Sequence, residues 1–476
     1  MKQEYFISQR LGFTNAQAEK IKRFGVEGFV DLSMKAPYDF LMPDFLENAP
    51  RSRKEFQNLK AMNEEKKRLL VVIEVFRNAG LARWWVDRMY NLEYPMREKM
   101  VLFWHNHFVS SFEKVKSSWA MYNQNTLFRD NAFGNFKELT RLILYDNAML
   151  TYLDNFKNKK GELNENLSRE LLELFTLGVG NYTEQDIKEG AKALAGLNLG
   201  EGKGRYYPRI SDDSVKTYLG KKGNLKADDM VEAIFAHPKA AHRITEKLLK
   251  YFVSDTPSLS MIDEYAAFLK KENYEIEPFL LKMSTDKRFQ ESQGEKIKDP
   301  LSFVLQVHHE FQLDLPSVKR LVPYFNQQGM TPLLPPNVKG WDGGKSWLSS
   351  QKLLQRMNIV SLLSSGKNLE AFSFKGEKKE DSAMEEMKMN SEQVFGKNGD
   401  KMSTKIPEFR WDKNAKTNKD IIKSVSDRLL FAVNNDVQQD MERVLKYDFN
   451  PTEMNAQLSV TRLAEYVMKT PEFQIC

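Results

Sequence analysis

The chain has 476 residues, of which 41% are hydrophobic and 29% are charged, and its formal net charge is +6. This length can bury a large core, and the composition is that of a globular protein rather than a disordered one. The small net charge, with both signs interspersed, argues against a dedicated nucleic-acid-binding protein, which usually carries a concentrated basic surface.

Cys476 is the last residue and the only cysteine, so we expect neither an internal disulfide nor a cysteine-based zinc site. No apolar run approaches the ~18 residues that a membrane helix needs, and the start, MKQEYFISQRLGF, lacks the apolar run of a signal peptide. We therefore expect a soluble protein without a membrane span. It would be cytoplasmic as given, or belong to the cell envelope or periplasm if a leader was removed; the compartment itself is left unknown.

Helical periodicity begins near the start of the chain. Thr14 and Gln17 have the spacing of a capping box, and Gly25 follows where that helix would end. Apolar residues then recur at helical spacing over residues 64–77, and the sequence Asn78-Ala79-Gly80 predicts the end of that second helix.

Residues 95–111, PMREKMVLFWHNHFVSS, place two histidines two positions apart. The apolar flanks predict a helix, in which the side chains of His105 and His107 point ~200° apart and cannot share a metal ion. His107 lies inside the apolar arc, and we expect His105 on the far side, at the surface or in a cleft. Either a buried structural histidine or an acid/base group fits this pattern.

Residues 164–186, NENLSRELLELFTLGVGNYTEQD, predict a helix that has Asn164 as its N-cap and stops at Gly178. Thr183 and Asp186 then cap the next helix.

Charged residues line one face of the first of these two helices. Glu165, Arg169 and Glu173 follow each other at four-residue spacing, which is typical of a solvated ladder of ion pairs. Glu170, in contrast, lies at the edge of the apolar stripe, where partial burial would raise the pKa of its carboxyl group. A half-buried carboxyl beside an arginine is also how general acids are built. Both interpretations remain open.

Residues 200–223 are rich in Gly, Tyr, Lys and Asp and predict a small hairpin or a long loop. Within them, Asp212, Asp213 and Lys216 form either an ordinary turn or one wall of a site.

The segment LLPPNVKGWDGGKSW, residues 333–347, is rich in Pro and Gly. It is not a phosphate-binding loop, because Lys339 stands where that motif needs a glycine. We expect a rigid loop that presents Trp341 and Trp347, either to pack in the core or to stack on a sugar ring.

A stretch poor in large aliphatic residues, 366–416, follows and cannot bury much apolar surface. We therefore predict a main helical domain over residues 1–365, a flexible linker or insertion over 366–416, and C-terminal helices over 417–476 that pack on the main domain. The predicted fold is mainly α, a multi-helical body with a small irregular or β-containing excursion around residues 200–223.

Taken together, these segments resemble a bacterial family known only as a domain of unknown function, DUF 1800. The matching stretches are SQRLGF, ARWWVDRMYNLEYPMREKMVLFWHNHF, GNFKELTRLILYDNAMLTYLDN, NENLSRELLELFTLGVGNYTEQDIKEGAKALAG, VKTYLG, HPKAAHRITEKLLKYFV, PPNVKGWDGGKSWL and TPEFQ. The resemblance spans nearly the whole chain apart from the linker, and FWHNHF and the long NEN stretch are its most specific parts.

The resemblance implies a site but no settled reaction. The candidate catalytic residues that it carries over are His105, His107, Arg169, Glu170 and Glu173. The candidate substrate-binding residues are Asn106, Asn164, Asn166, Glu184, Asp212, Lys216 and Trp341. No metal ligand and no cofactor is predicted. The family pattern usually has His at the positions of Phe6 and Ser211 and commonly Gln at Met330, so a site that uses those positions would be altered here.

Two functions follow from this resemblance and from the residue types. One is a hydrolase that acts on a glycan or another cell-envelope or secreted polymer, with glutamate as the acid/base, histidine as a proton relay, Arg169 as an anion clamp and Trp341 as a stacking surface. The alternative is a non-catalytic helical binding partner of an exported sulfatase-like protein, because relatives are often encoded beside such a family. A metal-dependent enzyme is a third option, although no standard ligand spacing occurs.

Overall fold

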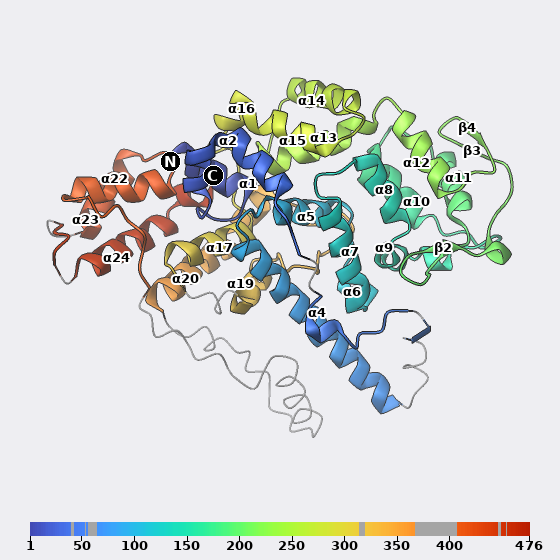
Figure 1. Cartoon of the computed structure of the whole chain (residues 1–476), viewed down its shortest axis with the longest axis horizontal. Coiled ribbons are helices and arrows are strands. Elements are labelled where there is room, and N and C mark those ends of the chain that lie inside the picture. Colours follow the sequence, from blue (N-terminus) through green and yellow to red (C-terminus); the bar gives the residue numbers. More distant parts are fainter. Residues whose placement is uncertain are drawn as a thin grey trace.

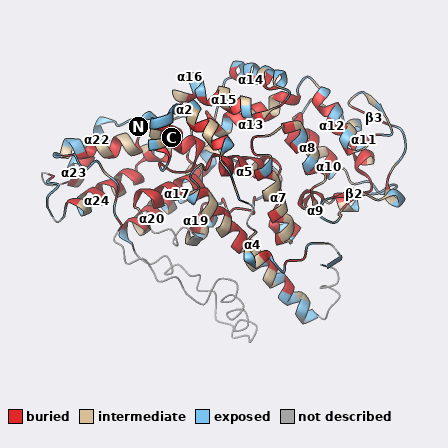
Figure 2. Ribbon diagram, in the orientation of Figure 1, coloured by how far each residue is buried: buried red, intermediate tan, exposed pale blue. Residues whose placement is uncertain are grey.

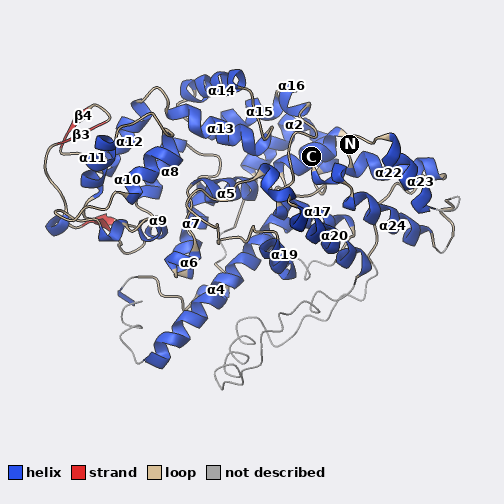
Figure 3. Cartoon of the chain, turned by 180° about the vertical axis from the view of Figure 1, so that it is seen from behind, coloured by secondary structure: helices blue, strands red, loops and turns tan. Residues whose placement is uncertain are grey.

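The computed structural model describes residues 1–39, 42–52, 54–55, 64–313, 319–366, 407–445, 449–453 and 455–476. Helices make up most of these residues, and the strands form two short antiparallel pairs (Figure 3). The prediction of a mainly α, multi-helical fold is therefore confirmed.

The first two helices, α1 (Gln3–Leu11) and α2 (Ala18–Lys35), pack against each other close to both chain ends (Figure 1). The predicted capping by Thr14 is wrong, because its hydroxyl accepts from the backbone of Ala16 and α2 starts without a side-chain cap. Gly25 interrupts α2 with φ 70° and ψ 174°, which agrees with the predicted break.

Helix α4 (Glu64–Asn91) runs diagonally away from the body in Figure 1. It continues through Asn78-Ala79-Gly80, so the predicted end at these residues is wrong. A Cβ atom at Gly80 would lie 3.1 Å from the ring of Phe45. The glycine therefore makes room for an aromatic neighbour, which the local sequence pattern does not reveal.

Helix α5 (Met96–His107) lies in the middle of the molecule, with α2, α4 and α7 (Ser118–Asp130) packed around it (Figure 2). Every residue of α5 except Asn106 is buried. His105 is only 1% exposed, so its expected place at the surface or in a cleft is wrong. A helix that is surrounded by neighbours has no solvent-facing side, whatever its sequence suggests.

Helix α10 (Asn166–Glu170) continues into a π-helical turn, η3 (Leu171–Thr176), and ends ahead of Gly178, as predicted. Its N-cap is Glu165, one residue after the predicted Asn164, and the Asn164 side chain accepts from the backbone of Asn166 at 3.0 Å.

Helix α11 (Glu184–Leu194) begins with the predicted capping box of Thr183 and Asp186. The chain then forms two hairpins, which confirms the small β excursion. In one, β1 (Leu197–Asn198) pairs with β2 (Arg205–Tyr206), and in the other β3 (Lys216–Tyr218) pairs with β4 (Lys221–Gly223).

The remaining elements complete the body and follow one another as short helices. Between α5 and α10 these are α6 (Phe112–Val115), α8 (Phe136–Leu144) and α9 (Asn147–Tyr152). After the hairpins come α12 (Ala227–Ala236), α13 (Ala240–Phe252), α14 (Leu259–Lys271), α15 (Ile276–Thr285), α16 (Lys287–Gln290), α17 (Pro300–Glu310) and α19 (Val322–Gln327). The single turns are η1 (Asp44–Leu46), η2 (Asn155–Lys157), η4 (Pro208–Ile210), η5 (Lys319–Leu321) and η6 (Gly344–Leu348).

The last helices pack onto the same body. They are α20 (Ser350–Ser365), α22 (Asn418–Leu429), α23 (Asn435–Leu445), α24 (Ala456–Lys469) and the turn η8 (Pro471–Gln474). Helix α24 packs against α20 and α23, and one apolar cluster extends from Phe6 to Phe473. Most of the predicted linker, residues 367–406, lies outside the described residues. The division into residues 1–365 and 417–476 stays a prediction.

Candidate functional site

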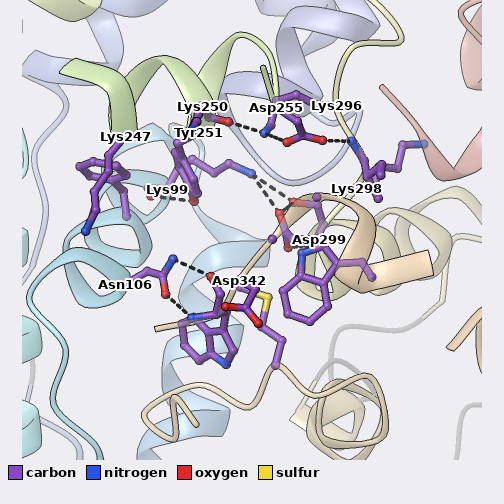
Figure 4. A pocket seen from close by; sticks show the side chains of 18 of the residues that line it. Lys99, Asn106, Lys247, Lys250, Tyr251, Asp255, Lys296, Lys298, Asp299 and Asp342 are labelled. Atoms are coloured by element: carbon purple, nitrogen blue, oxygen red, sulfur yellow. Dashed lines mark hydrogen bonds and ion pairs between the residues drawn. The ribbon is translucent and has the colours of Figure 1, made fainter. Parts of the chain in front are cut away.

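A cavity of about 420 Å³ opens beside α5, between α13 and the start of α17 (Figure 4). Helix α1 and the loop that precedes η6 complete its wall. Its lining is rich in Lys and Arg; these residues are Arg10, Lys99, Arg243, Lys247, Lys250, Lys296, Lys298 and Lys339. Its carboxylates are Glu246, Asp255, Asp299 and Asp342. Basic side chains therefore outnumber acidic ones in the lining, which favours a positive potential. The excess is moderated because Cys476 places a negative charge beside Arg10 and because burial lowers the pKa of Lys247 and of Lys298 to about 7.

Some of these cations hold the wall itself together. The guanidinium of Arg10 donates to the backbone oxygens of Phe252, Val253, Ser292 and Cys476, at 2.6 to 2.8 Å. Lys296 pairs with Asp255 at 2.8 Å, and that carboxylate also accepts from the backbone of Ile297 at 3.1 Å. These contacts hold α1, α13 and the segment before α17 together.

Lys99 of α5 crosses the centre of the cavity (Figure 4). Its ammonium donates to the hydroxyl of Ser302 at 3.1 Å and lies 3.9 Å from the carboxylate of Asp299. Asp299 in turn caps α17 by accepting from the backbone of Ser302 at 2.8 Å. Burial lowers the pKa of Lys99 below its ordinary value.

Lys298 is the most enclosed cation of the lining, with 2% of its surface exposed. Among the described residues its ammonium has no hydrogen-bond partner, and it lies 3.7 Å from the centroid of the Phe473 ring. Burial lowers its pKa to about 7, although the negative charges of Cys476 and Glu310 act in the opposite direction. Burying an amine without a directly paired carboxylate is costly for stability, and groups with shifted pKa values concentrate at functional sites.

The loop before η6 is fastened to α5 by Asn106. The Asn106 side chain accepts from the backbone nitrogen of Trp341 at 2.7 Å and donates to the Trp341 carbonyl at 3.5 Å. Gly340, with φ 83°, brings the loop so close that a Cβ atom would lie 2.2 Å from the Asn106 oxygen. Trp341 is 5% exposed, so most of its ring packs rather than standing free for stacking.

His107 lines the same cavity and is buried. Burial keeps its pKa well below the usual range, and the positive charges of Lys247 and Arg243 act in the same direction. The ring is therefore neutral at pH 7. His105 lies in a separate aromatic cluster, 5.4 Å from Trp85 and 5.8 Å from Trp341 between ring centroids, and burial lowers its pKa to about 3.

The predicted residues of the α10 region form a different network. Arg169 pairs with Glu165 at 3.1 Å and with Glu184 at 2.9 Å, in the ladder that the sequence predicts. The Tyr182 hydroxyl donates to Glu173 at 3.3 Å. None of these residues lines the cavity.

Glu170 is half-buried, and burial together with the charge of Glu173 raises the pKa of its carboxyl group. It is not a lining residue, although the charge of Lys339, on the rim, acts on the same carboxyl. Neither helix α10 nor its π-helical turn contributes a residue to the lining.

Asp212 and Lys216 lie apart from the cavity, in the second hairpin region. The Lys216 ammonium is buried, lies 3.5 Å from the Asp212 carboxylate and donates to two backbone oxygens, those of Asp212 and Ser214, at 2.8 Å. This arrangement closes a turn.

The structure thus brings three of the predicted residues together at the cavity. They are Asn106, His107 and Trp341. Of the positions that depart from the family pattern, Met330 lines the cavity and Phe6 packs beside it, with the Arg10 guanidinium 4.9 Å from the Phe6 ring centroid. Ser211 lies at the end of η4, away from the cavity.

Sequence reasoning missed the lysines that dominate the cavity. Arg243, Lys247 and Lys250 stand at positions i, i+4 and i+7 of α13, so one helical stripe of positive charge was visible in the sequence. No pattern among neighbouring residues indicates that Arg10, Lys99 and Lys298 line the same cavity as these three.

A family model described as "Protein of unknown function (DUF1800)" matches residues 7–475. The chain therefore belongs to this family, as the resemblance indicated. No curated protein and no solved structure matches it. In the part of the chain that the structure describes, no helix has the length and apolarity to cross a membrane, and no three His, Cys, Asp or Glu side chains are grouped to hold a metal ion.

Proposed function

We propose that this protein binds an anionic ligand, one that carries carboxylate, sulfate or phosphate groups, in the lysine-rich cavity beside α5. The observation that carries the proposal is the excess of cations over carboxylates in a lining of described residues that is large enough for a small molecule or a chain end. Asp255, Asp299 and Glu246 are each already engaged by a lysine of the wall. The positive charge that remains for a ligand is that of Arg243 and Lys339, together with the protonated fraction of Lys247 and Lys298.

A titration with three probes tests the proposal. The probes are a sulfated disaccharide, its unsulfated counterpart and inorganic phosphate, with binding followed by calorimetry at low and high salt. We expect the sulfated sugar to bind and the neutral one to fail, with affinity falling as salt rises, because salt screens charges near a surface. Phosphate that binds as well as the sulfated sugar would show that the anionic group alone is recognised.

Single charge removals at the rim provide the matched test. Lys339→Ala and Arg243→Ala should each weaken binding by about three- to tenfold, which corresponds to about 1 kcal/mol for one partly exposed charge contact. Lys271→Ala removes an exposed lysine of α14 that does not line the cavity, and it should leave binding unchanged. Equal losses in all three variants, or tight binding of the neutral sugar, would contradict the proposal.

Hydrolysis of an acidic glycan is the second candidate function. It is favoured by the raised pKa of Glu170, since a general acid must hold its proton near neutral pH. The charge of Lys339, a lining residue on the rim, acts on this carboxyl group, and we expect a polymer bound at the lysines to extend toward Glu170. Binding to a sulfatase-like protein stays a prediction of the family resemblance.

A further inference from the structure

Lys247 differs from the other charged residues of its helix stripe. Lys250 pairs with Glu246 at 2.6 Å, and Arg243 lies 3.5 Å from the same carboxylate. Lys247 has no carboxylate within ion-pairing distance among the described residues, and its ammonium donates to the backbone oxygen of Leu174 at 3.2 Å. That oxygen lies in the last turn of η3, where backbone carbonyls have no partner within the helix and accept from side chains.

The surroundings of Lys247 favour the free amine. Burial, assisted by the charge of Arg243, lowers its pKa to about 7, whereas an ordinary lysine has a pKa of about 10.4. At pH 7 about half of the Lys247 side chains therefore carry a lone pair on nitrogen. A desolvated lysine next to another cation is one arrangement that turns an amine into a nucleophile.

We propose that Lys247 forms a Schiff base with an anionic aldehyde or ketone held in the cavity. The inference rests on the proposed anion binding, because the other lining cations would hold the acidic group of the ligand while its carbonyl carbon meets the Lys247 nitrogen. The geometry supports this because Lys247 lines the cavity and shares that lining with Lys99, Lys298 and Lys339.

The reaction needs no further reagent. The lone pair of the Lys247 nitrogen adds to the carbonyl carbon, the C–N bond forms, and one proton moves from nitrogen to the former carbonyl oxygen. The resulting carbinolamine loses water and leaves a C=N bond. Nothing is oxidised or reduced, and hydrolysis of the imine regenerates the free amine.

Borohydride trapping tests the inference. The full chain is incubated with pyridoxal 5′-phosphate, an anionic aldehyde, at pH 7.5, and the adduct is reduced and located by peptide mass spectrometry. We expect labelling of Lys247 at least tenfold faster than labelling of Lys250, although Lys250 is the more exposed of the two. Adducts that form mainly on Lys250, or equally on exposed lysines throughout the chain, would overturn it.

Two variants separate loss of the imine from loss of the fold. Lys247→Arg retains the positive charge but cannot form an imine, so it should lose the adduct and still bind the probe without reduction. Lys271→Ala should keep the Lys247 adduct. An adduct of undiminished yield in Lys247→Arg would overturn the inference.

A second aldehyde separates failure of the imine from failure of anion binding. Pyridoxal lacks the phosphate, so we expect its labelling of Lys247 to be at least tenfold slower. Binding of pyridoxal 5′-phosphate in dialysis without a Lys247 adduct would overturn the imine and leave the proposed anion binding intact. Equal labelling of Lys247 by both aldehydes would instead contradict the anion site on which the inference rests.

Discussion

Buried charges in this protein differ in whether they have hydrogen-bond partners. Glu98 of α5 is 0% exposed, yet it accepts from Arg129 at 2.6 and 2.8 Å and from the indole of Trp85 at 3.0 Å. Lys298, in contrast, has no hydrogen-bond partner for its ammonium in the part of the chain that the structure describes. A partnered buried charge is compensated, whereas one without partners destabilises the fold, and such groups concentrate at functional sites.

The Glu170 carboxyl group allows a test of the proposed hydrolysis. Burial and the charge of Glu173 raise its pKa, so more of it holds a proton at neutral pH than an exposed glutamate would. If it is the general acid, Glu170→Gln should lower turnover of an acidic oligosaccharide by about 10² to 10⁴-fold, the usual contribution of a positioned acid. Reducing-end release is the measurement.

The control for this variant is Glu162→Gln, an exposed glutamate of the loop before α10 that pairs with Lys159. It should leave turnover unchanged, and both variants should unfold at the temperature of the unaltered protein. Full turnover in Glu170→Gln would end the assignment of Glu170 as the acid and leave anion binding as the function.

Residues at helix ends hold several of the side chains that line the cavity. Asp299 caps α17 and also lies 3.9 Å from the Lys99 ammonium, and the Leu174 carbonyl at the end of η3 accepts from Lys247. The sequence predicted the capping of α11 and the end of the helix before Gly178, because capping and glycine signals are local. It did not predict the π-helical turn, since a run of leucines fits α and π spacing alike.

Two glycines in the loop before η6 allow a matched test of how this loop is fastened. Both Gly340 and Gly343 have positive φ, 83° and 74°, so alanine is strained by about 1 to 3 kcal/mol at either position. Only at Gly340 would the added Cβ meet Asn106; nothing lies within 4 Å at Gly343. We expect Gly340→Ala to lose about 2 kcal/mol more stability, because the two Asn106 hydrogen bonds to Trp341 are each worth about 1 kcal/mol.

Urea unfolding measures the difference, and anion binding provides the second measurement. Gly340→Ala should also weaken binding of the sulfated probe, because Trp341 and Lys339 shift with the loop, while Gly343→Ala should not. Equal destabilisation of the two variants would show that Asn106 does not hold the loop.

At the scale of the whole molecule, a buried ion pair joins the beginning, middle and end of the chain. Arg428 of α22 pairs with Glu310 of α17, which is fully buried and also accepts from Asn15 at 2.8 Å. The Arg428 guanidinium lies 5.0 Å from the Tyr5 ring centroid. These contacts fasten the C-terminal helices to the body that carries the cavity.

Arg428→Met should therefore destabilise the fold by about 3 to 5 kcal/mol, because it leaves the Glu310 carboxylate buried without its partner. Hydrogen exchange should show α22 and α24 opening first. Lys423→Met, on the same helix, removes the exposed partner of Asp427 and should cost less than about 1 kcal/mol. Similar losses in both variants would contradict a special role of the Glu310 pair.

The sequence by itself determined the helical fold class, the hairpins near residues 200–223 and several helix boundaries, because these follow from periodicity and capping among neighbouring residues. Family membership followed from motifs as well. Tertiary structure decided that α4 continues past Gly80, that His105 is buried, and which charged residues share a cavity. Those outcomes depend on contacts between residues from tens to hundreds of positions apart, such as Phe45 with Gly80 and Arg10 with Ser292, and no local pattern encodes which distant residues will meet.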